Sequence, residues 1–199
     1  NSIEMDGYFG LNEHLSYDYY PASAFKTPIW GLLQANQMLA TEFVIDFCNK
    51  VGDAYKKSHL NIDYRECFDI TICVGGQSVT QTASTRLWQM YRGSHVGPNL
   101  LVSLLMGFER WLLNIVKISP TNTVEEYCQY ILSKSKNVML TAIIVSIAEA
   151  YPEKMLDIVC DLIKTKEIFH LDSNRFSSER TTSFALFKND LFTNERKES

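Results

Sequence analysis

The residues of this chain that could do chemistry gather in one loop, Arg92-Gly93-Ser94-His95-Val96-Gly97, which stands directly before Pro98 and a long apolar run. A phosphate-binding P-loop needs G-x-x-x-x-G-K-[ST], in which the lysine contacts the phosphates and the hydroxyl binds Mg²⁺. Here Gly93 stands four positions before Gly97, and Pro98 occupies the position of the lysine. The spacing therefore excludes a Walker A motif, and G-x-G-x-x-G is absent as well.

Two interpretations of this loop remain. The amides at the start of a helix after Pro98, together with Arg92, could hold an anion such as a carboxylate. The favoured interpretation is structural, because Gly93 and Gly97 permit a turn and Pro98 suits the start of a helix.

Nucleophilic catalysis would need a serine or cysteine that converges with a histidine and a carboxylate. The four histidines stand apart in the sequence, and no G-x-S-x-G surrounds any serine. Ser84 or Ser94 with His95 and Glu109 is the combination to test, although no spacing requires it. Glu109 is expected instead at a paired or solvated helix edge. We therefore predict no catalytic residue in this chain.

Aromatic residues cluster where the loop meets its neighbours, at Trp88, Tyr91, Phe108 and Trp111. Core packing is the favoured interpretation of this cluster, and a peptide-binding groove is the alternative. The candidate contact or anion site of the chain consists of Trp88, Tyr91, Arg92 and His95.

Composition limits the function classes. The chain has 199 residues, 46% of them hydrophobic, and a formal charge of −4, so it lacks the dense Lys/Arg surface of nucleic-acid binders.

Its five cysteines are scattered and form no C-x-x-C pair, which predicts neither a disulfide framework nor a zinc site. No apolar run approaches the roughly 18 residues of a membrane span, and no signal pattern opens the chain. We expect a cytoplasmic protein, and the start at Asn1 favours a piece of a longer one.

Two helices and a hairpin are predicted in the first half. A short helix is expected at 24–33 and a longer one at 37–55. The inward face of the longer helix would carry Met38, Phe43, Phe47, Val51 and Tyr55. Residues 68–74 then alternate between apolar and polar, Gly75-Gly76-Gln77 forms a turn, and the Thr-rich segment after it returns as a partner strand. Gly-Gly-Gln is also the tripeptide that release factors place in the ribosome, but its position between strands favours a turn.

The second half has helical periodicity. Apolar residues from Leu101 to Ile115 recur at helical spacing, and Thr123 to Glu126 has the form of a capping box that starts an amphipathic helix. The segment after Asn137 is apolar almost all round, which predicts a central, enclosed helix. Pro152 suits the first turn of the next helix, and residues after Leu171 have the composition of an exposed loop.

These elements predict a mainly α fold, an antiparallel helical array or bundle that resembles a degenerate repeat, with one β-hairpin inserted. The predicted organisation is a helical domain at 1–170, with the hairpin at about 67–88, followed by a polar linker and tail at 171–199.

The pattern L-W-x-x-Y-R-G, P-x-L-L, F-E-R-W-L and A-Y-P-E, within about residues 20–169, resembles the helical (HEAT-like) segments of large bacterial STAND-type NTPases, some of which act in antiphage defence. The resemblance implies an array that recognises a target or mediates oligomerisation beside a separate nucleotide-binding module. This chain shows neither Walker motif nor nuclease-like carboxylate cluster, so only the array role can transfer. We expect no cofactor in this chain and ATP only in a parent protein.

The sequence thus predicts a non-catalytic scaffold or sensor segment that contacts a protein partner or neighbouring domains of the same polypeptide. The alternative is a small hydrolase-like or anion-binding domain that uses the loop from Arg92 to Gly97.

Overall fold

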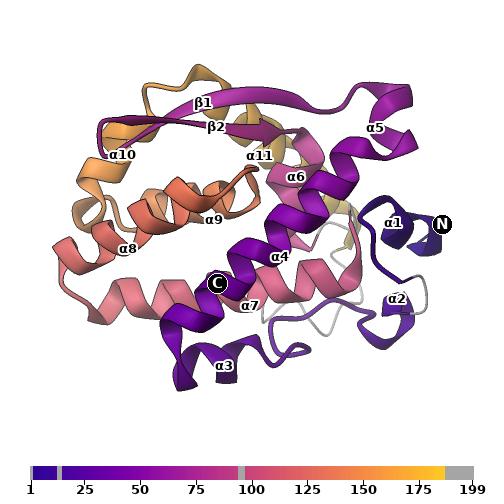
Figure 1. Cartoon of the computed structure of the whole chain (residues 1–199), viewed down its shortest axis with the longest axis horizontal. Helices are drawn as coiled ribbons and strands as arrows, with labels where there is room; N and C mark the ends of the chain where they lie inside the picture. Colours follow the sequence, from indigo (N-terminus) through magenta and orange to yellow (C-terminus); the bar gives the residue numbers. More distant parts are fainter. Residues whose placement is uncertain (1, 13–14, 94–96, 187–199) are drawn as a thin grey trace.

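The computed structural model describes the backbone of residues 2–12, 15–93 and 97–186, and the side chains of residues 5–12, 17–93 and 97–180. The fold is mainly α with one antiparallel β-hairpin, as predicted (Figure 1). In chain order the elements are α1 (Ser2–Tyr8), α2 (Leu15–Asp18), α3 (Ile29–Ala35), α4 (Gln37–Lys57), α5 (His59–Tyr64), β1 (Phe68–Val74), β2 (Gln77–Ala83), α6 (Thr85–Gln89), η1 (Met90–Arg92), α7 (Asn99–Ile118), α8 (Thr121–Lys134), α9 (Met139–Ala150), η2 (Pro152–Lys154), α10 (Leu156–Leu162) and α11 (Lys166–Leu186).

Helix α9 is the centre of the molecule. It contacts α4, α6, α7, α8 and α10, and in Figure 1 it lies between the hairpin and α7. Every residue from Met139 to Val145 is buried. This confirms the enclosed helix predicted after Asn137, because a helix that is apolar all round can hide its surface only when neighbours cover every side.

The hairpin has the predicted turn. Gly75 and Gly76 adopt φ of +55° and +80°, and the strands pair from Val74 opposite Gln77 to Phe68 opposite Ala83. Positive φ at both turn residues suits the right-handed twist of a two-residue hairpin, and glycine adopts it without a Cβ penalty.

The predicted hairpin at 67–88 is too long at its end. Strand β2 stops at Ala83, and the Ser84 hydroxyl accepts a hydrogen bond from the Leu87 amide, 3.1 Å away, which caps α6. Leu87 and Trp88 are fully buried on that helix. A serine N-cap and two large apolar side chains therefore turn the chain into the core where alternation suggested a strand.

The hairpin is tied to the helices at both edges. On the β1 side, the Gly75 amide donates to Asp161 of α10 (2.8 Å). On the β2 side, the Thr82 amide donates to the Lys136 carbonyl (2.9 Å), and the Val138 amide donates to the Thr82 carbonyl (3.1 Å). The strand edges therefore lie against α10 and the start of α9.

Three helix predictions need correction. The helix expected at 24–33 begins at Ile29, and the capping box at Thr123 lies inside α8, which already begins after Pro120. On α4 the buried face includes Val44, Ile45, Cys48, Val51 and Tyr55, whereas Met38 and Phe43 are about half exposed. The helical spacing of apolar residues does not show which of two apolar faces of α4 is buried, because the position of the neighbouring helices decides which face is covered.

The loop predicted after Leu171 is wrong as far as Leu186, because α11 continues to that residue. Its composition is polar, but Arg175 in its middle is almost fully buried among carboxylates. Ion pairs therefore stabilise this part of α11, whose sequence lacks apolar residues at helical spacing. Residues 187–199 lie outside the described part, and the domain boundary at 170 stays a prediction.

Candidate functional site

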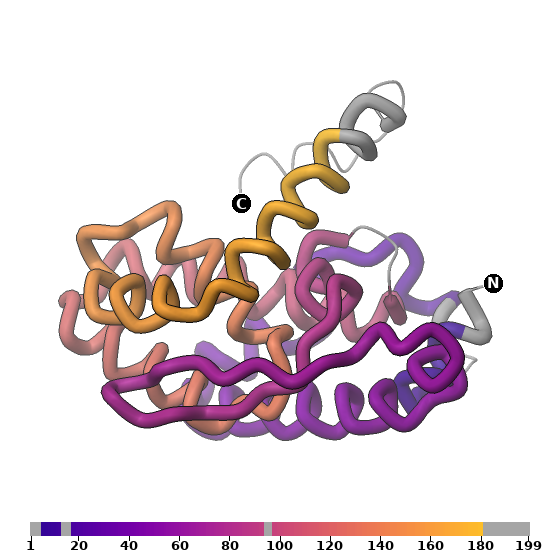
Figure 2. Tube along the Cα trace, turned by 90° about the horizontal axis from the view of Figure 1, so that it is seen from above, coloured from indigo at the N-terminus to yellow at the C-terminus, as the bar shows by residue number. Residues whose placement is uncertain are grey.

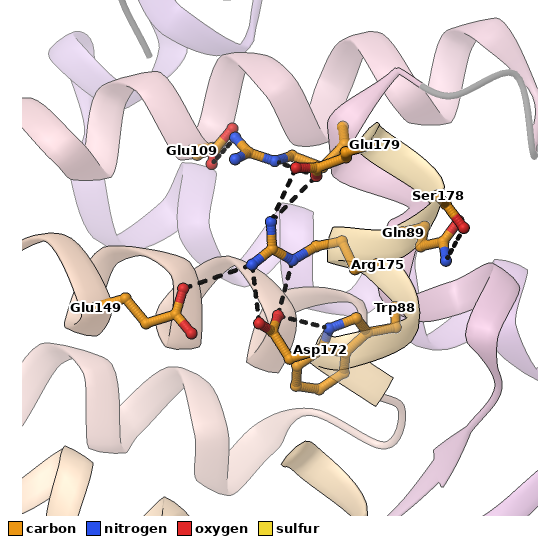
Figure 3. Close-up of polar contacts among 9 residues, drawn as sticks. Trp88, Gln89, Glu109, Glu149, Asp172, Arg175, Ser178 and Glu179 are labelled. Carbon is orange, nitrogen blue, oxygen red and sulfur yellow. Dashed lines mark hydrogen bonds and ion pairs between the residues drawn. The ribbon is translucent and has the colours of Figure 1, made fainter. Parts of the chain in front are cut away.

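Helix α11 rises out of the helical body (Figure 2). Near its start, Ile168 and Leu171 are buried in the core. Beyond them its contacts with α6, α9 and η1 are polar and charged (Figure 3). The attachment of α11 therefore rests on hydrogen bonds and ion pairs more than on an apolar stripe.

Arg175 is the centre of these contacts. Its Nε and Nη2 atoms donate to both oxygens of Asp172 at 2.7 and 2.9 Å, and its Nη1 donates to Glu179 at 3.1 Å. Nη2 also reaches Glu149 of α9 at 3.5 Å. Burial alone would lower the pKa of Arg175, but the hydrogen bonds to Asp172 and the nearby carboxylates raise it above its ordinary value. The guanidinium thus stays charged and joins α11 to α9.

Trp88 links this centre to α6. The indole Nε1 donates to Asp172 Oδ1 at 3.2 Å, and the neighbouring Gln89 side chain donates to the Ser178 hydroxyl at 3.3 Å. Burial alone would raise the pKa of Asp172, but the hydrogen bonds from Arg175 and Trp88 lower it. Asp172 is therefore the fixed anion at the centre of the cluster.

Arg92 forms the second branch, on the side of η1 and α7. Its Nε donates to Glu179 at 2.9 Å, and its Nη1 lies 3.5 Å from Glu109 of α7. Glu109 is only 4% exposed, and burial raises its pKa to about 7 although the charge of Arg92 opposes the shift. A carboxyl group in this position holds a proton near neutral pH.

Carboxylates outnumber arginines in this network. Two arginines stand among four acidic residues, which are Glu109, Glu149, Asp172 and Glu179. The pKa of Glu149 is raised as well, by burial and by the neighbouring charge of Asp172. A proton on Glu109, whose pKa is raised to about 7, therefore reduces the excess of negative charge.

An open cavity of about 610 Å³ lies between α9, α10 and α11, and we call it the α11 groove. Its wall is mostly apolar and includes Val145, Ala148, Val159, Ile163, Phe169 and Phe176. Polar groups of the wall come from Glu149, Asp172, Ser173 and Arg175. The charged cluster thus forms one end of an apolar groove that opens beside the protruding helix.

Two of the four residues of the contact site predicted from the sequence do not lie on the surface. Trp88 and Tyr91 are completely buried, and the Arg92 side chain, which is 28% exposed, is paired with Glu109 and Glu179. His95 lies outside the described residues. Trp88 and Tyr91 are therefore core residues, and the anion site at Arg92 and His95 stays a prediction. Core packing, the favoured interpretation of the aromatic cluster, is confirmed.

The catalytic alternative is not assembled by the described residues. Ser84 caps α6 and is fully buried, and Glu109 is paired with Arg92. Ser94 and His95 lie outside the described part. Gly93 adopts φ of +64° at the end of η1, which agrees with the structural interpretation of the glycine loop.

Sequence reasoning missed Glu149, Asp172, Arg175 and Glu179. A signal was present, because Asp172, Arg175 and Glu179 are spaced three and four residues apart and so share one helix face. Read as a helix, the segment predicts two ion pairs along its own length.

Within the described residues, no group of three or more His, Cys, Asp or Glu side chains is arranged to hold a metal ion. The same part of the chain contains no helix with the length and apolar character needed to cross a membrane. No protein-family model matches the sequence. A comparison with curated proteins gives no significant match.

Proposed function

We propose that this chain is a non-catalytic helical scaffold or sensor segment that works through protein contacts, and that the α11 groove is its contact surface. One observation carries the proposal. The groove is apolar, and three large apolar side chains on it, Ile163, Phe169 and Phe176, are each more than half exposed. Contiguous exposed apolar surface of this kind marks interaction sites.

We also propose that the segment belongs to a larger bacterial NTPase of the cytoplasm, possessing its own ATP-binding module and acting in antiphage defence. The support is the resemblance of residues 20–169 to the helical segments of such proteins. The coding sequence on either side of this segment tests it. A Walker motif on the same polypeptide is the expected result, and a complete gene without one would refute the assignment.

Site-specific photocrosslinking in the native host tests the contact function. The full protein would carry p-benzoylphenylalanine at Phe176, and a control would carry it at Ile62, which is exposed on α5 away from the groove. We expect a protein adduct from Phe176 alone, identified by mass spectrometry, and its loss when Phe169→Ser is added. Equal adducts from both positions, or none from Phe176, would refute the contact function.

A small-molecule binding domain is the second candidate. The cavity volume of about 610 Å³ falls within the range of ligand pockets, roughly 300–1,000 Å³. The site would then be the α11 groove and not the loop from Arg92 to Gly97, since Arg92 already binds two carboxylates. A thermal-shift screen would reveal it as an increase in Tm that Phe176→Ser abolishes.

A further inference from the structure

The wall that α11 contributes to the groove has a regular pattern of large and small residues. Phe169, Ser173, Phe176 and Ser177 line the groove at positions i, i+4, i+7 and i+8 of one helix, so they occupy one face. Ser173 stands between the two phenylalanines along the helix, and Ser177 follows Phe176. Such a surface accepts side chains that project at helical spacing from a second helix.

The exposed apolar surface is longer than a small ligand. Phe169 and Phe176 are separated by two turns of α11, or roughly 10 Å along the helix axis. Ile163, just after α10, extends the surface on the opposite wall. Because all three side chains are more than half exposed, a small molecule in the cavity would leave much of them in water, whereas a helix lying along α11 would cover them.

Within the lining of the α11 groove, the exposed charged side chains are negative. Side chains of Glu149 and Asp172 are 55% and 20% exposed, whereas Arg175 between them is only 7% exposed and is occupied by its carboxylates. A nearby cation, Arg180, stands outside the groove lining and stacks on the Phe176 ring at 5.6 Å. The most exposed charged side chain of the groove lining is therefore Glu149, which lies 3.5 Å from Arg175.

We propose that the α11 groove binds an amphipathic helix of a partner protein, with an apolar stripe against Phe169, Ser173 and Phe176 and a basic side chain against Glu149. This inference rests on the proposed contact function and names its partner class. The chain itself has a net charge of −4, so a protein of different, basic sequence complements it better than a second copy does.

Two model peptides of about 15 residues test the inference by fluorescence anisotropy with the whole chain at physiological salt. Both carry the same leucine stripe, and their polar faces consist of lysine in one and glutamate in the other. We expect the Leu/Lys peptide to bind at least about tenfold more tightly, and Phe176→Ser to weaken it by about tenfold, the loss of one buried aromatic contact.

Charge reversal supplies the decisive comparison. Glu149→Lys is expected to weaken the Leu/Lys peptide and strengthen the Leu/Glu peptide. Glu126→Lys, on the exposed surface of α8, changes the net charge equally and should leave both affinities within about twofold. Circular dichroism of each variant verifies that the fold is retained.

Several outcomes would overturn the inference. These are absence of peptide binding, equal binding of the two peptides, equal effects of Glu149→Lys and Glu126→Lys, or a dimer of the chain that Phe176→Ser dissociates. Binding of dodecylamine in place of the peptides would identify a small-molecule site instead.

A crosslinked partner that contacts Phe176 through something other than a basic helix would leave the contact function standing and refute this inference alone. Absence of any crosslinked partner would refute the contact function even if the peptide binds.

Discussion

Arg92 and Glu109 face each other at 3.5 Å across the junction of η1 and α7, and the carboxyl group of this pair is almost completely buried. The same Arg92 also binds Glu179 of α11 at 2.9 Å. The position of α11 is thus linked to a buried acid that titrates near neutral pH, since burial raises the pKa of Glu109 to about 7.

Glu109→Gln should flatten the pH dependence of stability. The folded-state pKa of about 7 lies above the ordinary value of 4.5, so the native state binds the proton more tightly than the unfolded chain does. This contribution is fully present below about pH 4.5 and is lost as the pH rises through about 7. Glutamine imitates the protonated form, and the variant should equal or exceed the wild type in free energy of unfolding at pH 8. Urea unfolding from pH 5 to pH 8 measures the free energy of unfolding of both proteins.

The control Glu126→Gln, at an exposed position, should leave the pH dependence of the free energy of unfolding unchanged. Parallel curves for the wild type and Glu109→Gln would contradict the prediction.

Arg175→Met should destabilise the protein by about 3–5 kcal/mol, because it removes the buried guanidinium that pairs with Asp172 and Glu179 and leaves their carboxylates without this partner. Hydrogen exchange along α11 should accelerate, and Tm should fall. The matched control is Arg180→Met on the same helix, whose exposed stacking on Phe176 contributes less than about 1 kcal/mol. Equal losses for the two variants would show that the buried network does not hold α11.

Gly107→Ala should destabilise the packing of α7 against the segment before α3. A Cβ atom at Gly107 would lie 2.7 Å from Ile29 Cγ2 and 2.8 Å from the Ala24 carbonyl oxygen. Because a backbone atom cannot move aside easily, we expect a loss of about 1–3 kcal/mol in the free energy of unfolding. Gly31→Ala on α3 meets nothing within 4 Å and should stabilise by about 0.5–1 kcal/mol. Chemical denaturation measures the free energy of unfolding of both variants. A change in the same direction for Gly107→Ala and Gly31→Ala would disprove the prediction.

Gly75→Val should weaken the hairpin by about 1–2 kcal/mol, because Gly75 adopts φ of +55°, which a β-branched residue tolerates poorly. Gly75→Asn should retain most of the stability, since asparagine adopts the left-handed region more readily. Thermal unfolding separates the two variants. An identical Tm for both would mean that the backbone conformation at this turn does not limit stability.

Much of the architecture follows from sequence periodicity. The alternation at 68–74 with Gly75-Gly76 predicts the hairpin, and the apolar run after Asn137 predicts the buried helix α9. These signals are local, because they depend on the spacing of side chains along one element. The continuation of α11 was not predictable in the same way, since its polar composition is compensated by Glu149 and Trp88, which belong to other helices.

The candidate site shows the same division. Spacing in the sequence excludes a P-loop before Pro98 and places Asp172, Arg175 and Glu179 on one face of any helix they form. Trp88 and Tyr91 have the aromatic character of a contact site, but the packing of α6 against α9 and α11, and of η1 against α7 and α9, makes them core residues.

By itself, the sequence determined the mainly α composition, the hairpin and the central helix, because these follow from periodicities of two and 3.6 residues. Tertiary structure alone decided which face of α4 is buried, that the segment after Leu171 is a helix, and that the open surface is the α11 groove. The physical reason is that burial and ion pairing are properties of neighbours in space. Glu109 acquires its raised pKa, and Arg92 its two carboxylate partners, only when η1, α7 and α11 meet.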